Sequence, residues 1–233
     1  MRILDITAHP MNIKDYKIYC AGPLFNPKEQ EEMESIASVL KKSGYNVFLP
    51  QEDGLELACI LPELQRYGIP HKEAASICNK AIFALDVFQI MTSHGLVLNM
   101  NGRVPDEGAM VEAGIAWAHG KTLVIFNTDK RTLVQGNCNP MVMGLSNFES
   151  VSSYEDLPIV FDRKFSTIKK NISPVVESHF DTANKQGKTI SEYLTKQKTT
   201  DEITELLIAL FAEVSCQSIK GKKKIFLQAH MQP

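Results

Sequence analysis

The sequence predicts an α/β fold in which helices cover both faces of a parallel sheet. Strand-like and helix-like segments alternate between residues 16 and 126, and short links join them. Such alternation is typical of parallel sheets, because the chain must cross over between parallel strands. From residue 150 onward the pattern becomes helical. A chain of 233 residues suits one domain with an appendage or a small second domain.

The predicted elements follow in a regular order. The predicted strands are 16–20, 45–49, 95–99 and 122–126. The predicted helices are 27–42, 74–84 and 107–119. Pro27 suits the first position of its helix, and Gly44 stops that helix. Residues 51–70 contain turns and two prolines, which indicates a functional loop or a short helix.

An apolar stripe near the C-terminus predicts one more helix. The stripe follows Thr200 and consists of Ile203, Leu206, Leu207, Leu210, Phe211 and Val214. We expect this helix to pack on the main domain, and a dimer contact is the alternative.

The composition argues against several classes of partner. The chain has 25 Lys and Arg against 27 Asp and Glu, which gives no reason to expect a nucleic-acid polymer or an anionic membrane. No apolar run of membrane-spanning length or signal-peptide pattern is recognised. Five cysteines without a CxxC pair favour reduced thiols and a cytoplasmic location. Six scattered histidines predict no metal site.

Glu112 is the only ionisable residue in the apolar stretch 108–118. As a helix this stretch should be buried, and a lone buried carboxylate costs several kcal/mol unless it is paired, protonated or facing a cavity. A structural ion pair with a distant Lys or Arg is the alternative. The preceding Gly- and Pro-rich turn, 102–108, and the small neighbours of Glu112 favour a carboxylate at the rim of a pocket.

Three loops are expected at the carboxyl ends of the strands, where open parallel sheets bind ligands. They begin after 16–20, after 45–49 and after 95–99, and the first contains Gly22, which permits close approach of a ligand to the backbone. Neither GxGxxG nor GxxxxGK[ST] is present, so dinucleotide and triphosphate binding have little support.

Five motifs, in order over about residues 16–150, resemble the nucleoside 2-deoxyribosyltransferase family. They are Tyr19-Cys-Ala-Gly-Pro-Leu-Phe25, Leu49-Pro-Gln51, Asp86, Asp106-Glu-Gly-Ala-Met-Val-Glu-Ala-Gly114 and Asn139-Pro-Met141. The resemblance implies a flavodoxin-like sheet and exchange of the base on a 2′-deoxyribosyl group without a cofactor. The implied ligands are deoxyribonucleosides and free nucleobases.

The resemblance also implies a role for each matching residue. Glu112 matches the nucleophile that attacks the anomeric carbon. Asp86 and Asp106 match the carboxyl groups that bind the base and manage its proton. Tyr19 matches the residue whose hydroxyl orients the nucleophile. Gln51 falls where the family holds the base.

The remaining matches concern the loops. Gly22 and Phe25 belong to the first motif and are expected to contact the substrate. Asn139 and Met141 match a segment that reaches towards the sugar 5′-hydroxyl in a neighbouring subunit's site, which implies a homo-oligomer.

The chemistry also suits these residue types. Cleavage of an N-glycosidic bond passes through an oxocarbenium-like state, which a carboxylate stabilises and can trap covalently. The base leaves poorly as an anion, so an acid must donate a proton or a hydrogen bond to it. Two carboxyl groups in one pocket shift each other's pKa, which leaves one protonated and one ionised.

Each candidate also has a purely local interpretation. Asp86 could cap a helix, and Asp106 suits the N-cap of the helix that follows it. Tyr19 could belong to the core, although a buried hydroxyl still needs a partner. Asn139 could start a turn, and Phe25 could either stack on a base or pack locally.

Two other functions compete with base exchange. A hydrolase of the same superfamily would cleave 2′-deoxynucleoside 5′-monophosphates with water as the acceptor, and it would need donors such as Ser146 or Arg103 for the phosphate. A non-catalytic nucleotide-binding or receiver-like module would need an acidic pair after the first strand, where Ala21, Gly22 and Pro23 stand.

We divide the chain into a lead-in over 1–15, a catalytic domain over 16–162 and a helical extension over 163–233. Some relatives carry an acidic residue where this chain has His94, and the extension is longer than in compact relatives. The change at position 94 is expected to alter local pairing, and the longer extension bears on how subunits are arranged.

Overall fold

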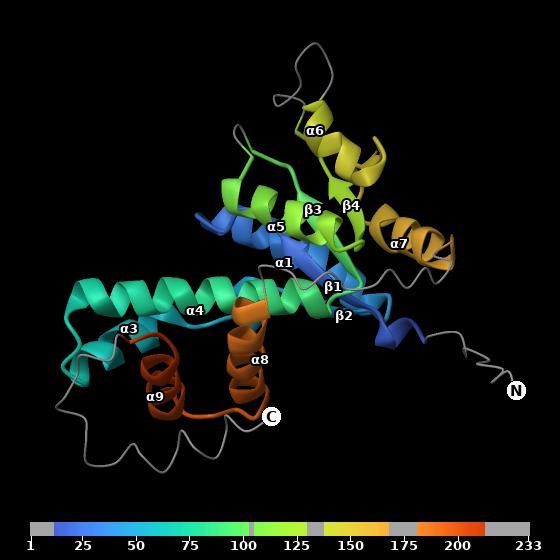
Figure 1. Cartoon of the computed structure of the whole chain (residues 1–233). Helices are drawn as coiled ribbons and strands as arrows, with labels where there is room; N and C mark the ends of the chain where they lie inside the picture. Colours follow the sequence, from blue (N-terminus) through green and yellow to red (C-terminus); the bar gives the residue numbers. More distant parts are fainter. Residues whose placement is uncertain (1–11, 103–104, 130–137, 168–180, 213–233) are drawn as a thin grey trace, which may run out of the picture. The chain divides into compact units, whose positions relative to one another are not determined.

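The computed structural model of the chain describes residues 12–102, 105–129, 138–167 and 181–212. Its centre is a five-stranded parallel sheet with the order β2-β1-β3-β4-β5 (Figure 1). The strands are β1 (Lys17–Ala21), β2 (Asn46–Phe48), β3 (Gly95–Asn99), β4 (Thr122–Phe126) and β5 (Ser150–Val151). This is the flavodoxin-like order, and it confirms the predicted α/β fold class.

Nine α-helices are described along the chain. They are α1 (Pro27–Lys42), α2 (Pro50–Asp53), α3 (Leu57–Arg66), α4 (His71–Thr92), α5 (Glu107–Ala118), α6 (Pro140–Met143), α7 (Asp156–Thr167), α8 (Asp181–Thr195) and α9 (Thr200–Phe211). Short 3₁₀ turns, η1 (Ile13–Asp15) and η3 (Gly144–Ser146), precede β1 and follow α6.

The chain forms two compact units. The described parts of Met1–Asp53 and Gln89–Ser178 make the first, and those of Gly54–Phe88 and His179–Pro233 make the second. The continuous helix α4 contributes residues to both units. The domain boundary predicted after residue 162 falls inside α7 and differs from this grouping, so that division stays a prediction.

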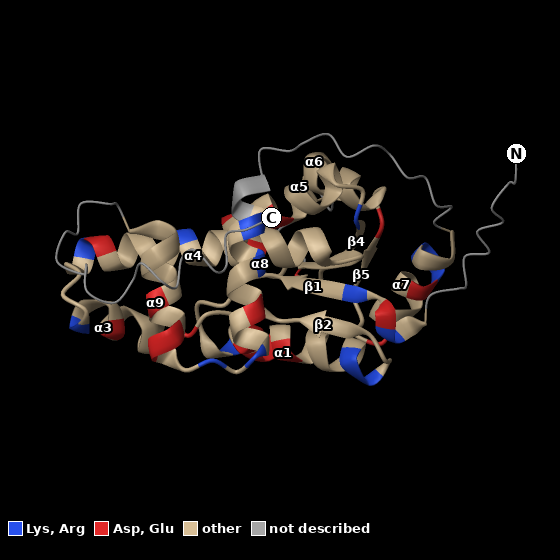
Figure 2. Ribbon diagram, turned by 60° about the horizontal axis from the view of Figure 1, so that its bottom comes forward, with Lys and Arg blue, Asp and Glu red and all other residues tan. Residues whose placement is uncertain are grey.

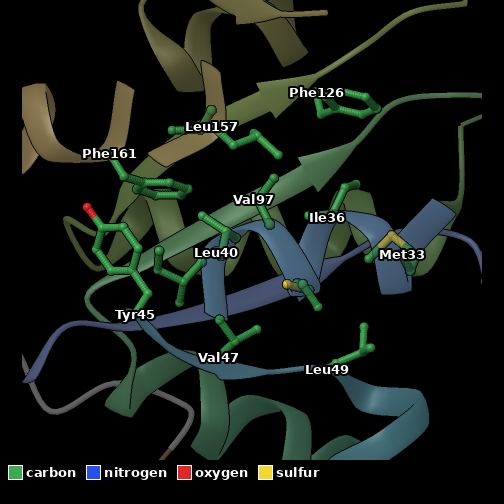
Figure 3. Close-up of a cluster of buried hydrophobic side chains, with 14 of the residues drawn as sticks. Met33, Ile36, Leu40, Tyr45, Val47, Leu49, Val97, Phe126, Leu157 and Phe161 are labelled. Atoms are coloured by element: carbon green, nitrogen blue, oxygen red, sulfur yellow. The ribbon is translucent and has the colours of Figure 1, made fainter. Parts of the chain in front are cut away.

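One face of the sheet carries the apolar core of the first unit (Figure 3). Ile18 and Cys20 of β1 point to this face, where α1 and α7 cover them. The helices contribute Met33, Ile36, Ala37, Leu40, Leu157, Phe161 and Phe165. Large side chains fill this layer, so we attribute most of the first unit's stability to it.

Local sequence signals set the ends of α1. The side chain of Asn26 caps its start by accepting hydrogen bonds from the backbone N–H groups of Lys28 and Glu29. Pro27 occupies the first turn, where no N–H donor is needed. Gly44 follows the helix with a φ of 96°, a conformation that glycine adopts without strain.

The opposite face of the sheet is covered by α5, which contacts β1, β3 and β4. Its buried residues are Ala109, Ala113, Ile115 and Ala116. Tyr19 of β1 points to this face, opposite to Ile18 and Cys20, because side chains alternate along a strand. Lys17 is the single charged residue in the five described strands, near the start of β1 (Figure 2).

The second unit is helical. Helix α9 packs on α3 and α8, and its stripe of buried residues includes Ile203, Leu206, Leu207 and Phe211. Arg66 at the end of α3 pairs with Asp201 at 3.2 Å. The predicted C-terminal helix is thus present, and its apolar stripe packs within the protein, although Val214 lies outside the described residues.

The structure also differs from the predicted elements in three places. Residues 51–70 hold two helices, α2 and α3, rather than a loop or one short helix. Helix α4 extends from residue 71 to 92, well beyond the predicted 74–84, because apolar residues continue past position 84. The two-residue strand β5 was not predicted, since so short a segment has no readable periodicity.

Helix α4 is long and apolar enough to cross a membrane by length and composition alone. By this test, the expectation that no apolar run is long enough to span a membrane is wrong. Half of its most apolar window is buried inside the protein, and core helices of water-soluble proteins pass the same test, so this is weak evidence for a membrane span.

Candidate active site

The loops that carry most of the candidate residues follow the carboxyl ends of the strands. Strand β1 lies between β2 and β3, so the chain reverses its direction of winding between β1 and β3. Ligands of open parallel sheets bind at such a switch point. The segment after β1 contains Gly22 and Phe25, and the segment after β3 leads into α5.

Tyr19 and Glu112 form the centre of the candidate site. The Tyr19 hydroxyl donates a hydrogen bond to Oε1 of Glu112 at 2.7 Å. The Tyr19 side chain is 0% exposed, and its ring stacks on Phe48 of β2 with the ring centroids 5.5 Å apart. A fully buried ring of this kind holds its hydroxyl in one place, so it fixes the direction of the half-buried carboxylate.

Small residues of α5 surround the base of Glu112. Ala109, Ala113 and Ala116 are buried between the helix and the sheet. Gly114, two residues further along the helix, has no atom within 4 Å of where a Cβ would lie. The Glu112 carboxylate is thus half-buried beside small residues of α5, and the hydrogen bond from Tyr19 orients it.

Asp106 is the N-cap of α5. Its Oδ2 accepts a hydrogen bond from the backbone N–H of Ala109 at 2.6 Å. A carboxylate at this position also interacts favourably with the helix dipole. The predicted capping role is confirmed, and it fixes Asp106 at the end of the helix that carries Glu112.

Asp86 lies on α4 and is half-buried. It belongs to the second unit, whereas Tyr19, Asp106 and Glu112 belong to the first. It lies inside the helix between Leu85 and Val87, so the alternative role of a helix cap is wrong.

The loop after β1 passes close to the neighbouring elements. A Cβ at Gly22 would lie 2.5 Å from Sδ of Met33 and 2.8 Å from Cβ of Asn99. Glycine is therefore required here by the protein's own packing. Phe25 is 82% exposed, so the alternative of local packing is wrong for its ring, and base stacking stays a prediction.

Gln51 lies at the start of α2 and is turned towards α1. Its Nε2 donates to Oε1 of Glu34 at 3.0 Å and to the carbonyl of Gln30 at 3.3 Å. Its Oε1 is buried and has no hydrogen-bond partner. The predicted contact with the base stays a prediction, and only this oxygen is left to make it.

Asn139 and Met141 lie at the start of α6. Oδ1 of Asn139 accepts a hydrogen bond from the backbone N–H of Met141 at 2.9 Å, so Asn139 caps this short helix. Asn139 is exposed, and Met141 is 81% exposed. Their side chains are thus available on the surface of the first unit.

Ser146 and Arg103 are the two expected hydrogen-bond donors to a substrate phosphate, and the structure describes only Ser146. The hydroxyl of Ser146 is buried and donates within its own turn, to the carbonyls of Glu149 at 2.6 Å and Met143 at 3.1 Å. Arg103 lies outside the described residues. Ser146 is therefore already satisfied by the backbone.

His94 supports the start of the sheet. Its Nδ1 accepts a hydrogen bond from the backbone N–H of Lys17 at 3.0 Å, and its ring meets that of Tyr16 edge to face. Burial, with Lys121 and Lys17 nearby, lowers the pKa of His94. A lowered pKa favours the neutral ring, whose Nδ1 can accept this hydrogen bond.

Two asparagines at the end of β3 were missed by the sequence analysis. Asn99 is fully buried, donates to Oε2 of Glu32 at 3.1 Å, and accepts from the backbone N–H of Asn101 at 3.0 Å. Oδ1 of Asn101 in turn accepts from the backbone N–H groups of Thr128 and Asp129. This network joins the loops after β3 and β4. The available signal was a pair of asparagines at the carboxyl end of an apolar strand, one as its last residue and one two positions later.

A cavity of about 420 Å³ adjoins this network. Its lining consists of Asn26, Lys28, Glu29, Glu32, Asn101, Gly102, Thr128 and Asp129. Neither Tyr19 nor Glu112 lines it. Within the described residues, no group of three or more His, Cys, Asp or Glu side chains is placed to hold a metal ion.

Comparison with known proteins places this geometry in a family. The sequence profile of the nucleoside 2-deoxyribosyltransferases matches residues 18–151, which is more than half of the chain. That region contains Tyr19, Asp86, Asp106 and Glu112.

The solved structures similar to the chain include the following two. A conserved protein from Enterococcus faecalis V583 has 21% identity and a TM-score of 0.48, and the match covers 64% of this chain and 98% of that one. A 2-desoxiribosyltransferase from Leishmania mexicana has 17% identity and a TM-score of 0.37, with 65% and 98% covered. No curated protein matches the chain. On the evidence of the family profile, the chain belongs to the nucleoside 2-deoxyribosyltransferase family.

Proposed function

We propose that this protein is a nucleoside 2-deoxyribosyltransferase, which exchanges the purine or pyrimidine base of a 2′-deoxyribonucleoside. The observation that carries the proposal is the 2.7 Å hydrogen bond from Tyr19 to Glu112. It directs the carboxylate of Glu112, the only ionisable residue of the apolar stretch 108–118, and the family profile covers both Tyr19 and Glu112. A carboxylate held in this way suits nucleophilic attack on an anomeric carbon.

The proposed reaction has two displacements. Glu112 attacks the anomeric carbon, the N-glycosidic bond breaks, and the bonding electrons leave with the base. Asp86 or Asp106 supplies a proton or hydrogen bond to the departing base, so that it leaves neutral. A second base then attacks the same carbon, gives up its proton to the carboxylate that supplied the first one, and releases Glu112. Two inversions give net retention of configuration.

Tyr19 serves this mechanism as a positioning residue. Its hydroxyl donates to the carboxylate and fixes its direction. Attack depends on a reacting distance of about 3–3.5 Å, so a fixed carboxylate direction contributes to the rate.

The proposal includes a site shared between subunits. Asn139 and Met141 are exposed at the start of α6, where they can reach a neighbouring molecule. We propose that they complete the neighbour's sugar site. Mixing a Glu112→Ala variant with an Asn139→Ala variant should then restore part of the activity, since some mixed sites contain both residues. No recovery after verified subunit exchange would contradict the shared site.

The competing function is hydrolysis of 2′-deoxynucleoside 5′-monophosphates. Ser146, one of its two expected phosphate donors, already donates to backbone carbonyls, which favours a substrate with a free 5′-hydroxyl.

One incubation separates transfer from hydrolysis. With deoxyinosine and free adenine, we expect deoxyadenosine and hypoxanthine to appear together. Free deoxyribose without deoxyadenosine would mean hydrolysis. In a second incubation, turnover of deoxyinosine monophosphate by a protein that does not turn over deoxyinosine would favour the competing function.

A further inference from the structure

The second unit contains a helix crossing that has no room for a side chain. Gly187 of α8 faces α4, and a Cβ built on it would lie 1.8 Å from the carbonyl oxygen of Ala84. The same Cβ would lie 2.5 Å from Cβ of Phe88. The first of these atoms belongs to the helix backbone, so the clash cannot be relieved by turning a side chain.

This crossing brackets the segment of α4 that carries Asp86. Ala84 precedes Asp86 by two residues, and Phe88 follows it by two. Leu85 and Val87, on either side of Asp86, are buried. Helix α8 at Gly187 therefore packs closely against α4 at positions on either side of this carboxyl group.

The face of α8 that carries Gly187 is buried. Ile190 follows Gly187 by almost one turn, lies on the same face of α8, and is fully buried. Lys188, between these two residues, is exposed. A substitution at buried Gly187 can therefore be compared with a control substitution at its exposed neighbour Lys188.

Helix α8 lies outside residues 18–151, the region that the family profile matches. We propose that the C-terminal extension acts as a brace for the proton-handling segment of α4, with Gly187 as a positioning residue for Asp86. This inference rests on the proposed function, because it assumes that Asp86 serves the departing base. A displacement of about 1 Å in such a group can lower a rate by about a hundredfold.

Hydrogen exchange tests the brace without any need for activity. In Gly187→Ala, the amides of residues 81–88 should exchange faster, while those of α1 and β3 should not change. The effect opposes intrinsic helix propensity, because alanine is a better helix former than glycine. Lys188→Ala is the matched control and should leave all these amides unchanged.

If Gly187→Ala does not fold, Ile190→Ala tests the brace in its place. It loosens α8 by removing buried side-chain atoms and introduces no clash. Faster exchange at 81–88 supports the brace. Unchanged exchange at 81–88 in the folded variants overturns it, whatever the activity of the protein.

A double-mutant cycle tests whether the brace acts through Asp86. Gly187→Ala should lower kcat/KM for base exchange by about tenfold or more. In an Asp86→Asn background the same change should lower it by less than about twofold, since the group being positioned is already gone. Equal losses in both backgrounds would overturn the positioning role.

Discussion

The two faces of the central sheet differ in what fills them. On the side of α1 and α7, large apolar groups such as Phe161 and Leu40 form a closed layer. On the side of α5, alanines leave space, and the main polar contact is that of Tyr19 with Glu112. One five-residue strand supplies both, since Ile18 and Cys20 face the first layer and Tyr19 the second. The first layer thus holds the fold, and the second holds the proposed chemistry.

The largest expected effect is on the α5 face. Glu112→Ala should lower base exchange by about a thousandfold or more, because the attacking group is lost. The free energy of unfolding should fall by only about 1–3 kcal/mol, because the buried Tyr19 hydroxyl loses its acceptor. Steady-state assays of exchange between deoxyinosine and adenine measure this. Glu107→Ala, an exposed position on the same helix, should keep near-normal activity.

Substitutions on the sheet face covered by α1 and α7 should lower the free energy of unfolding and leave activity unchanged. Phe161 is 0% exposed, so Phe161→Ala should lower the free energy of unfolding by about 3–5 kcal/mol. Activity per folded molecule should remain. Denaturant unfolding checks the first statement, and Ile159→Ala, at a position 63% exposed on the same helix, is the control. A comparable loss of stability in both variants would break the comparison between the faces.

Two glycines should respond in opposite directions to the same change. Gly22→Ala should destabilise the protein by about 1–3 kcal/mol, because its Cβ would meet Met33 and Asn99 at under 3.0 Å. Gly114→Ala on α5 has open space around it and should be neutral or stabilising, since alanine favours a helix. Equal changes in melting temperature for both would contradict the close packing at Gly22.

Removing one hydroxyl from each face sharpens the comparison. Tyr19 donates to Glu112, and Tyr45 on the other face donates to Asp162. Each change to phenylalanine should lower stability by about 1 kcal/mol, the typical contribution of one hydrogen bond. Only Tyr19→Phe should also lower kcat, by about tenfold. A similar loss of kcat in Tyr45→Phe would show that the hydroxyl of Tyr19 has no special role.

The smallest expected effect is a pH dependence from Lys17, on the same side of β1 as Tyr19. Burial lowers the pKa of Lys17 to about 8, so the unfolded chain binds more protons than the native one between pH 8 and 10. Taken alone, Lys17 makes stability rise with pH in this window. Burial raises the pKa of the Cys20 thiol, and burial with Asp162 raises that of Tyr45, so these two groups oppose the rise from about pH 9 and about pH 10 upward. Denaturant unfolding at several pH values should therefore show a more negative slope of stability against pH in Lys17→Met than in the parent protein between pH 8 and 10.

The sequence was sufficient for the fold of the first unit. Strands 95–99 and 122–126 and helix 27–42 were predicted with their observed bounds, because apolar periodicity and capping residues agree there. Helix α4 was predicted too short, although no Gly or Pro interrupts the sequence between residues 84 and 92. The grouping of residues 54–88 with the C-terminal helices depends on contacts between distant segments, which periodicity does not encode.

For the candidate site, the sequence identified the groups but not their partners. Glu112 was conspicuous as a lone charge in an apolar helix, and the structure adds Tyr19 as its hydrogen-bond donor. The orientation of Gln51 towards α1 was not predictable, because it depends on the distant Glu34. Gly187 had no signal at all, since a glycine within a helical pattern reveals nothing of the helix that it faces.

Direct detection of the proposed intermediate tests the central claim. The protein is mixed with deoxyinosine without an acceptor base, quenched in acid, digested and analysed by peptide mass spectrometry. A 2-deoxyribosyl group should be found on Glu112, should disappear when adenine is added before the quench, and should be absent in Glu112→Ala. Base exchange with the adduct on another residue, or with the adduct still formed in Glu112→Ala, would contradict Glu112 as the nucleophile.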